Sequence, residues 1–362
     1  MVANLYVHFP FCRRRCRYCA LYSRVGVSAA ARNAYVRQLA ESVDGLSAWL
    51  AQAGDADGFG TLKTVYFGGG SPALCELRPL LTALAPHLAA ETEFTVELHP
   101  QDVSDDTLGL LRDGGVNRIS MGVQSLDDAT LAAMGRGYTA AAAARAFAHV
   151  TRVFDNAGID LIVGYPGDPC VGWERLGDWG LRHASVYSLQ NERGLADVPD
   201  DDWTLDRIRA VAATLEGLGL ARYEISNYAV PGAECRHNLA VWRGEDYVGL
   251  GAGACGRVGL RRTRNLGACP QGATGPVPSG AGACPQSWPA LETETISPER
   301  DALERRIFRL RTREGLDATG FPQWGQALAA ACENGLLTRK NEIYRLTARG
   351  TEVCDAILAE LV

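Results

Sequence analysis

The sequence holds 362 residues, with 36 basic and 42 acidic side chains and a formal net charge of −6 at pH 7. A chain of this length buries a sizeable core, either as one large α/β domain with a smaller appendage or as two ordinary domains. The slight acidic excess offers no electrostatic footprint for DNA or for an anionic membrane. Nucleic acid is therefore not an expected partner.

No targeting or membrane segment is predicted. A strand-like run begins at Leu5, which leaves no room for a charged leader and an apolar signal core. No run of about 18 apolar residues follows. We therefore expect a cytoplasmic protein, whose 11 cysteines serve metal ligation or buried packing, because the cytosol keeps thiols reduced.

Short β-rich runs alternate with long helical patterns in the first half of the chain. The runs cover residues 5–9, 64–67, 94–98, 118–121, 160–163 and 185–189, and the helical patterns include residues 29–50 and 127–154. This alternation predicts βαβ units and a parallel sheet. Six successive units favour an α/β fold built as an incomplete parallel (β/α)6 barrel over an open doubly wound sheet, although periodicity alone does not separate the two.

Composition divides the chain into three parts. Residues 1–250 form the predicted barrel with its adjoining segment, and residues 251–297 are a linker or surface insertion rich in Gly, Ala and Pro. The insertion repeats Gly-Ala-Cys-Pro-Gln around Cys269 and Cys284, two cysteines that we expect to bind nothing. Residues 298–362 predict helices and a hairpin, a winged-helix-like α+β module whose mixed charge favours packing or partner docking over DNA binding.

Three cysteines, Cys12, Cys16 and Cys19, lie on one loop directly after the first predicted strand, where α/β enzymes place their chemistry. Tetrahedral zinc prefers four ligands, and the sequence has no second Cys-x-x-Cys pair. Three thiolates on a [4Fe-4S] cubane leave one iron open to chelate the amino and carboxylate groups of S-adenosylmethionine (SAM). Reduction of bound SAM by one electron then yields methionine and a 5′-deoxyadenosyl radical.

Other strand ends carry residues suited to a ligand. The second strand ends in a run of glycines before Ser71, where the backbone can approach a ligand closely and main-chain carbonyls can receive the SAM ammonium group. Glu97 and Gln124 follow the third and fourth strands, and Arg136 comes on a predicted helix beyond them. Their positions favour ligand contact, because parallel barrels build their sites at these ends.

These features resemble the radical SAM superfamily. The first strand, Leu-Tyr-Val-His-Phe-Pro-Phe before Cys-x3-Cys-x2-Cys, is similar to the coproporphyrinogen-oxidase-like branch, which includes oxygen-independent coproporphyrinogen III oxidases and haem chaperones of the HemW type. The similarity covers most of residues 4–255. It implies SAM contacts at positions Tyr6, Tyr18, Gly69, Gly70, Ser71, Glu97, Gln124, Arg136 and Asp160. Glu97 or Asp160 would bind the ribose hydroxyls, and Arg136 would lie near a carboxylate.

Two features favour the chaperones within this branch. The oxidases are longer and carry one more cysteine two residues beyond the third ligand, where this chain has Leu21. The chaperones carry His-Asn-x-x-Tyr-Trp, a signature associated with haem, which corresponds here to His237, Asn238 and Trp242. A histidine can ligate iron, an asparagine can orient it, and a tryptophan supplies a flat apolar wall.

Three residues depart from the family pattern. Val241 replaces the tyrosine of the signature, Tyr138 replaces a histidine after Arg136, and Cys255 stands where a histidine is common. These departures leave open a diverged member of the family with another substrate.

Three functions are compatible with the sequence. The leading hypothesis is a chaperone that binds haem through the His237 region and delivers it to an acceptor protein. A membrane-associated acceptor is compatible with this hypothesis, although this chain has no predicted span. The second is a radical enzyme that decarboxylates porphyrinogen propionates, or a related enzyme that methylates haem or opens its ring. The third is an interaction module with a structural metal site, which predicts zinc and no SAM. Haem or porphyrin is the expected small partner, the reductant is not identifiable, and the chain is a monomer or a homodimer.

Overall fold

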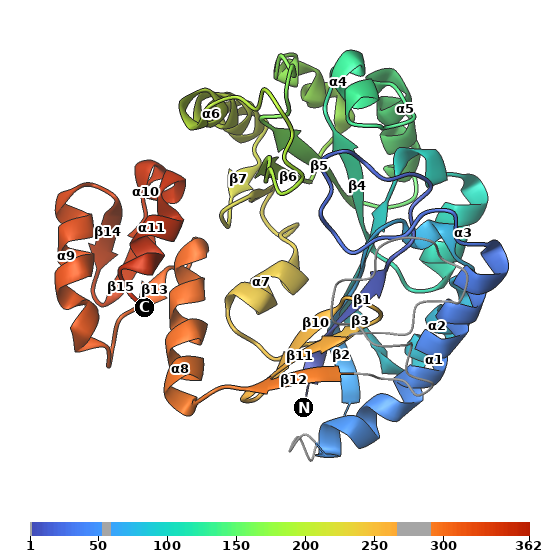
Figure 1. Ribbon diagram of the computed structural model, residues 1–362, viewed down its shortest axis with the longest axis horizontal. Helices are drawn as coiled ribbons and strands as arrows, with labels where there is room; N and C mark the ends of the chain where they lie inside the picture. The colour runs from blue at the N-terminus through green and yellow to red at the C-terminus, as the bar shows by residue number, and fades with distance from the viewer. Residues whose placement is uncertain (1, 53–58, 266–290) are drawn as a thin grey trace.

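The computed structural model describes residues 2–52, 59–265 and 291–362, so Cys269 and Cys284 lie outside the described residues (Figure 1). Its main sheet contains β1 (Val2–Phe9), β2 (Phe59–Gly69), β3 (Leu88–Leu98), β4 (Arg118–Gln124), β5 (Asn156–Val163), β6 (His183–Ser188), β7 (Ala221–Arg222), β8 (Asn227–Ala229) and β9 (Val248–Leu250). The strand order is β7-β8-β6-β5-β4-β3-β2-β1-β9. Strands β1 to β6 and β9 pair in parallel, whereas β8 and β7 are antiparallel at one edge. The predicted α/β fold with a parallel sheet is therefore confirmed.

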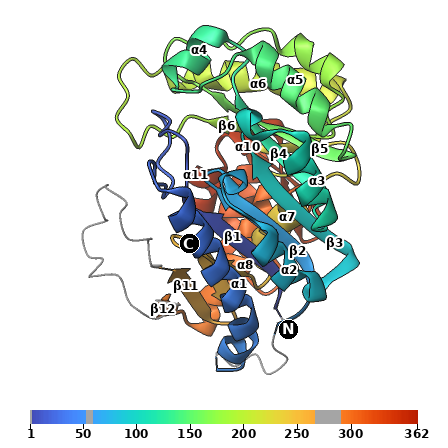
Figure 2. The ribbon, with the colours of Figure 1, turned by 90° about the vertical axis from the view of Figure 1, so that its right-hand side faces the viewer.

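Helices cover the outer face of this sheet (Figures 1 and 2). They are α1 (Ala29–Gln52), α2 (Arg78–Leu84), α3 (Asp105–Asp113), α4 (Asp128–Ala133), α5 (Ala140–Val150) and α6 (Asp201–Gly217). Side chains of Ser104, Asp127, Thr139 and Asp200 accept hydrogen bonds from backbone N–H groups in the first turns of α3, α4, α5 and α6. These caps fix where each helix begins, because the first N–H groups of a helix have no partner within it.

The helical pattern of residues 127–154 is two helices instead of one. Gly135 adopts a φ of 82°, which ends α4, and Thr139 then caps α5. Arg136 therefore lies in the turn between the helices, and our expectation that it would lie on a helix was wrong. Glycine reaches this left-handed conformation without steric cost, so the break is encoded locally.

The two sides of the first strands differ in chemistry. Leu5, Val7 and Phe9 are fully buried with the helices, and Phe67 of β2 packs beside Phe9 with ring centroids 5.1 Å apart. The alternate residues are polar or aromatic, and they face the inside of the curved sheet. Period-two alternation thus separates an apolar outer core from an interior that can bind ligands.

The segment beyond the barrel contains α7 (Arg236–Trp242) and a second sheet of β10 (Cys255–Val258), β11 (Arg261–Asn265) and β12 (Leu291–Thr295). All its neighbouring strands pair antiparallel. We predicted a linker or insertion over residues 251–297. The described flanks of that segment are strands, and Cys255 is exposed on the first of them.

The C-terminal module has the predicted mixture of helices and antiparallel strands. It contains α8 (Pro298–Ile307), β13 (Leu316–Asp317), α9 (Gly325–Glu333), β14 (Leu337–Lys340), β15 (Ile343–Leu346), α10 (Ala348–Glu352) and α11 (Cys354–Ala359). Its own apolar core includes Leu310, Leu316, Leu328 and Ile357. Within the described part of the chain, no helix is long and apolar enough to span a membrane.

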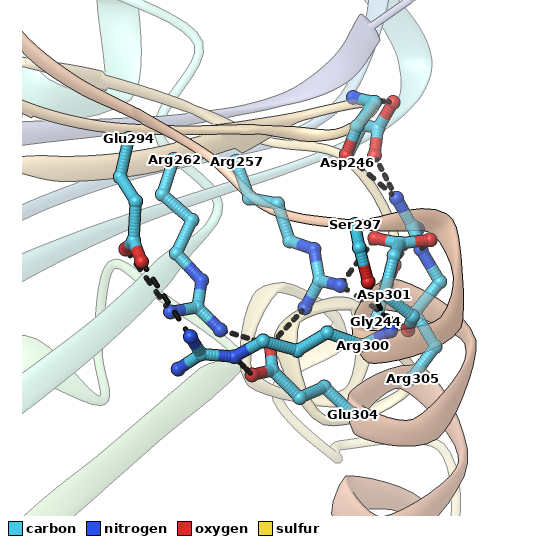
Figure 3. Close-up of polar contacts among 11 residues, drawn as sticks. Gly244, Asp246, Arg257, Arg262, Glu294, Ser297, Arg300, Asp301, Glu304 and Arg305 are labelled. Carbon is cyan, nitrogen blue, oxygen red and sulfur yellow. Dashed lines mark hydrogen bonds and ion pairs between the residues drawn. The ribbon is translucent and has the colours of Figure 1, made fainter.

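A set of ion pairs, which we call the charged clamp, joins the three-stranded sheet to α8 (Figure 3). Arg257 of β10 pairs with Asp301 and Glu304 of α8, and its side chain is only 8% exposed. Arg262 of β11 pairs with Glu304 as well. Within α8, Arg305 Nε donates to Asp301 at 2.8 Å. Each acidic residue of the clamp thus has more than one guanidinium partner.

A backbone strap connects the module to the barrel. Residues 223–226 follow β7, and Glu224 forms an antiparallel bridge with Thr312 of the module. Arg313 N–H donates to the carbonyl of Tyr223 at 2.9 Å. Ile225 packs against the core of the module. The strap therefore contacts both the barrel and the module.

Candidate functional site

One cavity of about 1790 Å³ extends from the cysteine loop to the C-terminal module. Its near end is lined by Cys12, Cys16 and Cys19, together with the carboxyl ends of the barrel strands. Its far end is lined by residues of α6, the strap and the module. A pocket for one small ligand measures about 300–1000 Å³, so this cavity has room for more than one.

Backbone hydrogen bonds hold the cysteine loop against the barrel. Cys12 N–H donates to the carbonyl of Arg24 at 2.9 Å, and Arg17 N–H donates to the carbonyl of Met134 at 3.0 Å. All three cysteines are free and partly accessible. Burial, followed by the neighbouring Cys19 and Cys16, raises the pKa of the Cys12 thiol to about 11. Ligation by iron would have to overcome this cost, because the thiolate is the ligand form.

The donor set of the loop fits an iron–sulfur cluster. Three free thiols lie within electrostatic range of one another, and three thiolates would leave the fourth iron of a cubane open. Among the described residues, no group of three or more His, Cys, Asp or Glu side chains surrounds a single metal position. The fit thus rests on the chemistry of the three cysteines and their shared loop.

Arginines support the loop from two directions. Arg13 Nε donates to the buried carboxylate of Asp102 at 2.9 Å, which ties the loop to the end of β3. Arg136 Nη1 donates to Cys16 Sγ at 3.4 Å, and its Nη2 donates to the carbonyl of Gly122 at 2.6 Å. A cation beside the cluster cysteines favours their thiolate form.

The glycine run makes room for the cysteine loop itself. Gly69 has a φ of 103°, and a Cβ there would collide with the ring of His8. A Cβ on Gly70 would collide with the carbonyl of Phe11, to which Ser71 N–H donates at 2.7 Å. Close packing against β1 and the start of the cysteine loop therefore explains these glycines.

Two half-buried acids, Glu97 and Asp160, lie on the inner face of the barrel. Glu97 accepts hydrogen bonds from Tyr66 Oη at 2.9 Å and from Gly69 N–H at 3.0 Å. Burial, and then the charge of Asp160, raise the pKa of Glu97 to about 7. Asp160 accepts from Ser120 Oγ at 3.0 Å, and burial raises its pKa too. Carboxylates held in this way can bind hydroxyl groups of a ligand.

The structure brings together most of the predicted SAM residues. The cavity is lined by Tyr18, Gly69, Gly70, Ser71, Glu97, Gln124, Arg136 and Asp160. Gln124 has a φ of 73°, an uncommon conformation for a residue with a side chain. Tyr6 is not part of that lining, and its hydroxyl lies 2.9 Å from Nδ1 of His8.

The predicted haem residues on α7 do not line the cavity. His237 is 5% exposed, and its Nδ1 lies 2.8 Å from the hydroxyl of Thr64. Since the single hydroxyl proton of Thr64 is donated to Asn4 Oδ1, Nδ1 of His237 must donate to Thr64. The ring of His237 lies behind Tyr66, which does line the cavity, with centroids 5.3 Å apart.

The two ends of α7 contact different parts of the molecule. Glu93 accepts from the backbone N–H groups of Arg236 and His237 at 3.0 and 3.1 Å, which anchors the start of the helix inside the barrel. At its other end Trp242 lies under Arg311 of the module, with the guanidinium carbon 5.2 Å from the ring centroid. Helix α7 therefore connects the barrel interior to the wall of the far cavity.

Sequence reasoning missed several residues of the site. Thr64 orients the histidine, a role that we had given to Asn238, and Glu93 anchors α7. Tyr138, noted only as a departure, accepts from Arg136 Nε at 2.8 Å and donates to the carbonyl of Gly122. Thr64 and Glu93 could have been recognised as polar residues at inward positions of β2 and β3. Polar residues at such positions of a buried strand need hydrogen-bond partners.

Comparisons with known proteins agree with this geometry. The radical SAM superfamily matches residues 6–173. The heme chaperone HemW of Lactococcus lactis is 30% identical, with 99% of this chain and 97% of that protein aligned. HemW of Mycobacterium tuberculosis is 32% identical, over 99% of this chain and 94% of that protein.

A solved structure shows the same fold. Coproporphyrinogen III oxidase (HemN) of Escherichia coli superimposes with a TM-score of 0.80 and 21% identity, covering 99% of this chain and 90% of that chain. Membership of the radical SAM superfamily implies binding of a [4Fe-4S] cluster and SAM. The chain belongs to the HemW family of radical SAM proteins.

Proposed function

We propose that this protein is a haem chaperone that binds haem and delivers it to an acceptor protein. The continuous cavity carries the proposal, because it joins the cysteine loop to a second space large enough for another ligand. The full-length similarity to proteins named heme chaperone supports haem as the cargo.

The near end of the cavity would hold the cofactors. Cys12, Cys16 and Cys19 would ligate the [4Fe-4S] cluster, whose open iron would bind SAM. When both are bound, they supply one-electron chemistry. Arg136 would stabilise the thiolate of Cys16 and the carboxylate of SAM, and Glu97 or Asp160 would accept hydrogen bonds from the ribose hydroxyls.

The neutral protonation state of His237 suits it to bind iron. Burial, and then the charge of Arg118, lower the pKa of His237 to about 3, so the ring is neutral at physiological pH. Donation from Nδ1 to Thr64 leaves the lone pair on Nε2. A ligating histidine is normally held in this manner, with its other nitrogen donating to a fixed partner. The ring of His237 contacts Tyr66, a residue of the cavity lining, with centroids 5.3 Å apart.

The rest of the signature would support haem indirectly. Trp242 lies under Arg311, which lines the far cavity, so it buttresses the wall against which a macrocycle would rest. Asn238 is half-buried on the same helix. Val241 removes the hydroxyl that a tyrosine would carry in this signature, so the wall here depends on Trp242.

The test is a haem titration of the protein after anaerobic reconstitution of its cluster, followed by its Soret absorption. We expect stoichiometric binding and transfer of haem to an apo haem protein. His237→Gln should shift the Soret maximum and weaken binding if Nε2 ligates iron. His149→Gln is the matched control, because His149 lies on the outer helix α5 and pairs with Asp105.

Other outcomes would identify another function. Absence of haem binding by wild-type protein, together with turnover of coproporphyrinogen, would replace the chaperone with a radical enzyme. Zinc in place of iron, without SAM binding, would leave only an interaction module. Leu21 stands 55% exposed in the cavity lining where the oxidases carry a fourth cysteine, so we expect no coproporphyrinogen turnover.

A further inference from the structure

We propose that haem lies in the far arm of the cavity, with its propionates bound by Arg222 and Arg345. We define the far arm by the lining residues Leu205, Ile208, Ala212, Ala213, Arg222, Ile225, Arg311, Arg345, Leu346 and Val353. The inference rests on the proposed haem-binding function and names the residues that recognise the cargo.

The cavity has space beyond the cofactor site, and no ligand has yet been assigned to its far arm. The cluster and SAM residues that line the cavity lie at the near end, on the cysteine loop, on or directly after strands β2 to β5 and, for Arg136, in the turn between α4 and α5. The whole cavity, at about 1790 Å³, exceeds the space that one small ligand needs. A second ligand of substantial size therefore fits the arm.

The walls of the arm are apolar on two sides. Leu205, Ile208 and Ala212 recur along one face of α6, and each is only half-buried. The module contributes half-buried Leu346 and also Val353, which is 41% exposed. A flat, apolar macrocycle would contact side chains of both walls. Binding would be favoured because the contact removes apolar surface from water.

Three arginines that line the far end of the cavity already have acidic partners. Arg209 pairs with Glu352, Arg311 pairs with Asp355 and Arg313 pairs with Glu234, with N–O distances of 2.7, 2.7 and 2.6 Å. These three pairs neutralise their guanidinium groups, which makes them weaker candidates for binding a carboxylate of the ligand.

Arg222 and Arg345 differ, because neither forms an ion pair within the part of the chain that the structure describes. Arg222 Nη2 donates to the hydroxyl of Tyr228, and Arg345 Nε donates to the carbonyl of Arg313 at 3.1 Å. Each guanidinium keeps further N–H groups for a ligand, and its planar fork matches a carboxylate. One arginine comes from the barrel and one from the module, so a dicarboxylate would bridge the two.

The experiment compares haem with haem dimethyl ester, in which the propionates carry no charge. Both are titrated into full-length, cluster-reconstituted wild type, Arg222→Gln, Arg345→Gln and the double variant. We expect each single variant to bind haem about tenfold more weakly, and the double variant about a hundredfold, because each loses a charge-assisted hydrogen bond. The ester should bind wild type and the double variant alike.

Arg349→Gln is the matched control, since Arg349 is exposed on α10 outside the cavity lining. Unchanged haem affinity in the double variant, or equal binding of haem and ester by wild type, would overturn the inference while leaving the chaperone function in place. Failure of wild type to bind haem at all would overturn the proposed function as well. The iron content of each variant reports whether the near end is intact.

A second pair of variants tests the space without changing charge. Ala213→Trp places a large side chain in the arm from an exposed position on α6, and should weaken haem binding at least tenfold. Ala210→Trp is the control, because Ala210 is exposed on the same helix but lies outside the cavity lining. This variant should bind haem as wild type does. Equal affinity of the two variants would place haem elsewhere.

Discussion

The nine-stranded sheet and the three-stranded sheet are stabilised in different ways, although β1 pairs with β9 and the neighbouring β10 begins the smaller sheet. The outer face of the large sheet is a continuous apolar core that includes Phe9, Phe67 and Phe94. The small sheet is joined to α8 by the charged clamp. Apolar burial stabilises by area and tolerates changes in pH, whereas a buried ion pair depends on every member remaining charged and paired. The two regions should therefore respond differently to mutation and to acid.

The largest expected effect is in the apolar core. Phe67→Ala should lower the free energy of unfolding by about 3–5 kcal/mol, since Phe67 is fully buried between Phe9 and Phe94. Urea unfolding of the apoprotein measures the loss, with Leu218→Ala, at a partly exposed position, as a control. A loss below about 1 kcal/mol would show that the core does not dominate.

The clamp should give a somewhat smaller loss. Arg257→Met should cost about 3 kcal/mol, because removing one partner leaves Asp301 and Glu304 partly buried with fewer cations. Arg261→Met, on an exposed position of the same sheet, should change stability by less than about 0.5 kcal/mol. Equal effects of the two substitutions in urea unfolding would mean that the clamp contributes little.

Mild acid should first affect His237 of α7, which belongs to neither sheet. The pKa of His237 is lowered to about 3 in the folded state, below the ordinary value of 6.5, so the unfolded chain takes up a proton that the folded chain does not. This stability is fully present above pH 6.5 and is lost as the pH falls toward 3. Between pH 7 and 5, wild type should lose about 2 kcal/mol more than His237→Gln. Parallel losses in both proteins would contradict the assignment.

The clamp should respond to acid only at lower pH. Burial alone would raise the pKa of Asp301, but hydrogen bonds from Arg257 and Arg305 outweigh it and lower the pKa. A carboxylate with a depressed pKa contributes stability above its unfolded pKa and loses that stability as the pH falls through the folded value. The difference in stability between wild type and Arg257→Met should therefore stay constant from pH 7 to 5.

The smallest effect should come from the exposed ion pair beside the strap. Arg313→Gln removes its pair with Glu234, in which the arginine side chain is 56% exposed, and should cost about 0.5 kcal/mol or less. Its backbone N–H still donates to Tyr223. A loss of several kcal/mol in urea unfolding would show that charge, and not the strap, attaches the module.

Local patterns predicted the barrel because β-rich runs alternate with long helical patterns along the sequence. They did not predict β11 or β12, whose charged residues, such as Arg261 and Glu292, resemble a solvated segment until the two strands pair. The spacing of four residues in Asp301–Arg305 and Arg300–Glu304 is typical of ion pairs within one helix. Their further partners on β10 and β11 come from distant sequence.

In the candidate site, too, local features could be predicted from the sequence and long-range contacts could not. Residues at strand ends were predictable, because the topology of a parallel barrel gathers them at one edge. The partners of His237 were not, since Thr64 and Glu93 lie far away in sequence and inside the strands. Arg222 and Arg345 carried no local signal, because only the packing of the module against the strap brings them to one cavity.

Tyr223 has a consequence for dividing this protein into fragments. Its carbonyl accepts from Arg313 of the module, and its hydroxyl accepts from Cys235 N–H at the start of α7. The same hydroxyl lies 2.8 Å from Nε2 of His183 on β6. A fragment that begins at Pro298 would lack this partner and would expose the core surface that Ile225 covers. Separate expression of the module would therefore require grafting the strap onto it, and any truncation series should keep residues 223–226 with both halves.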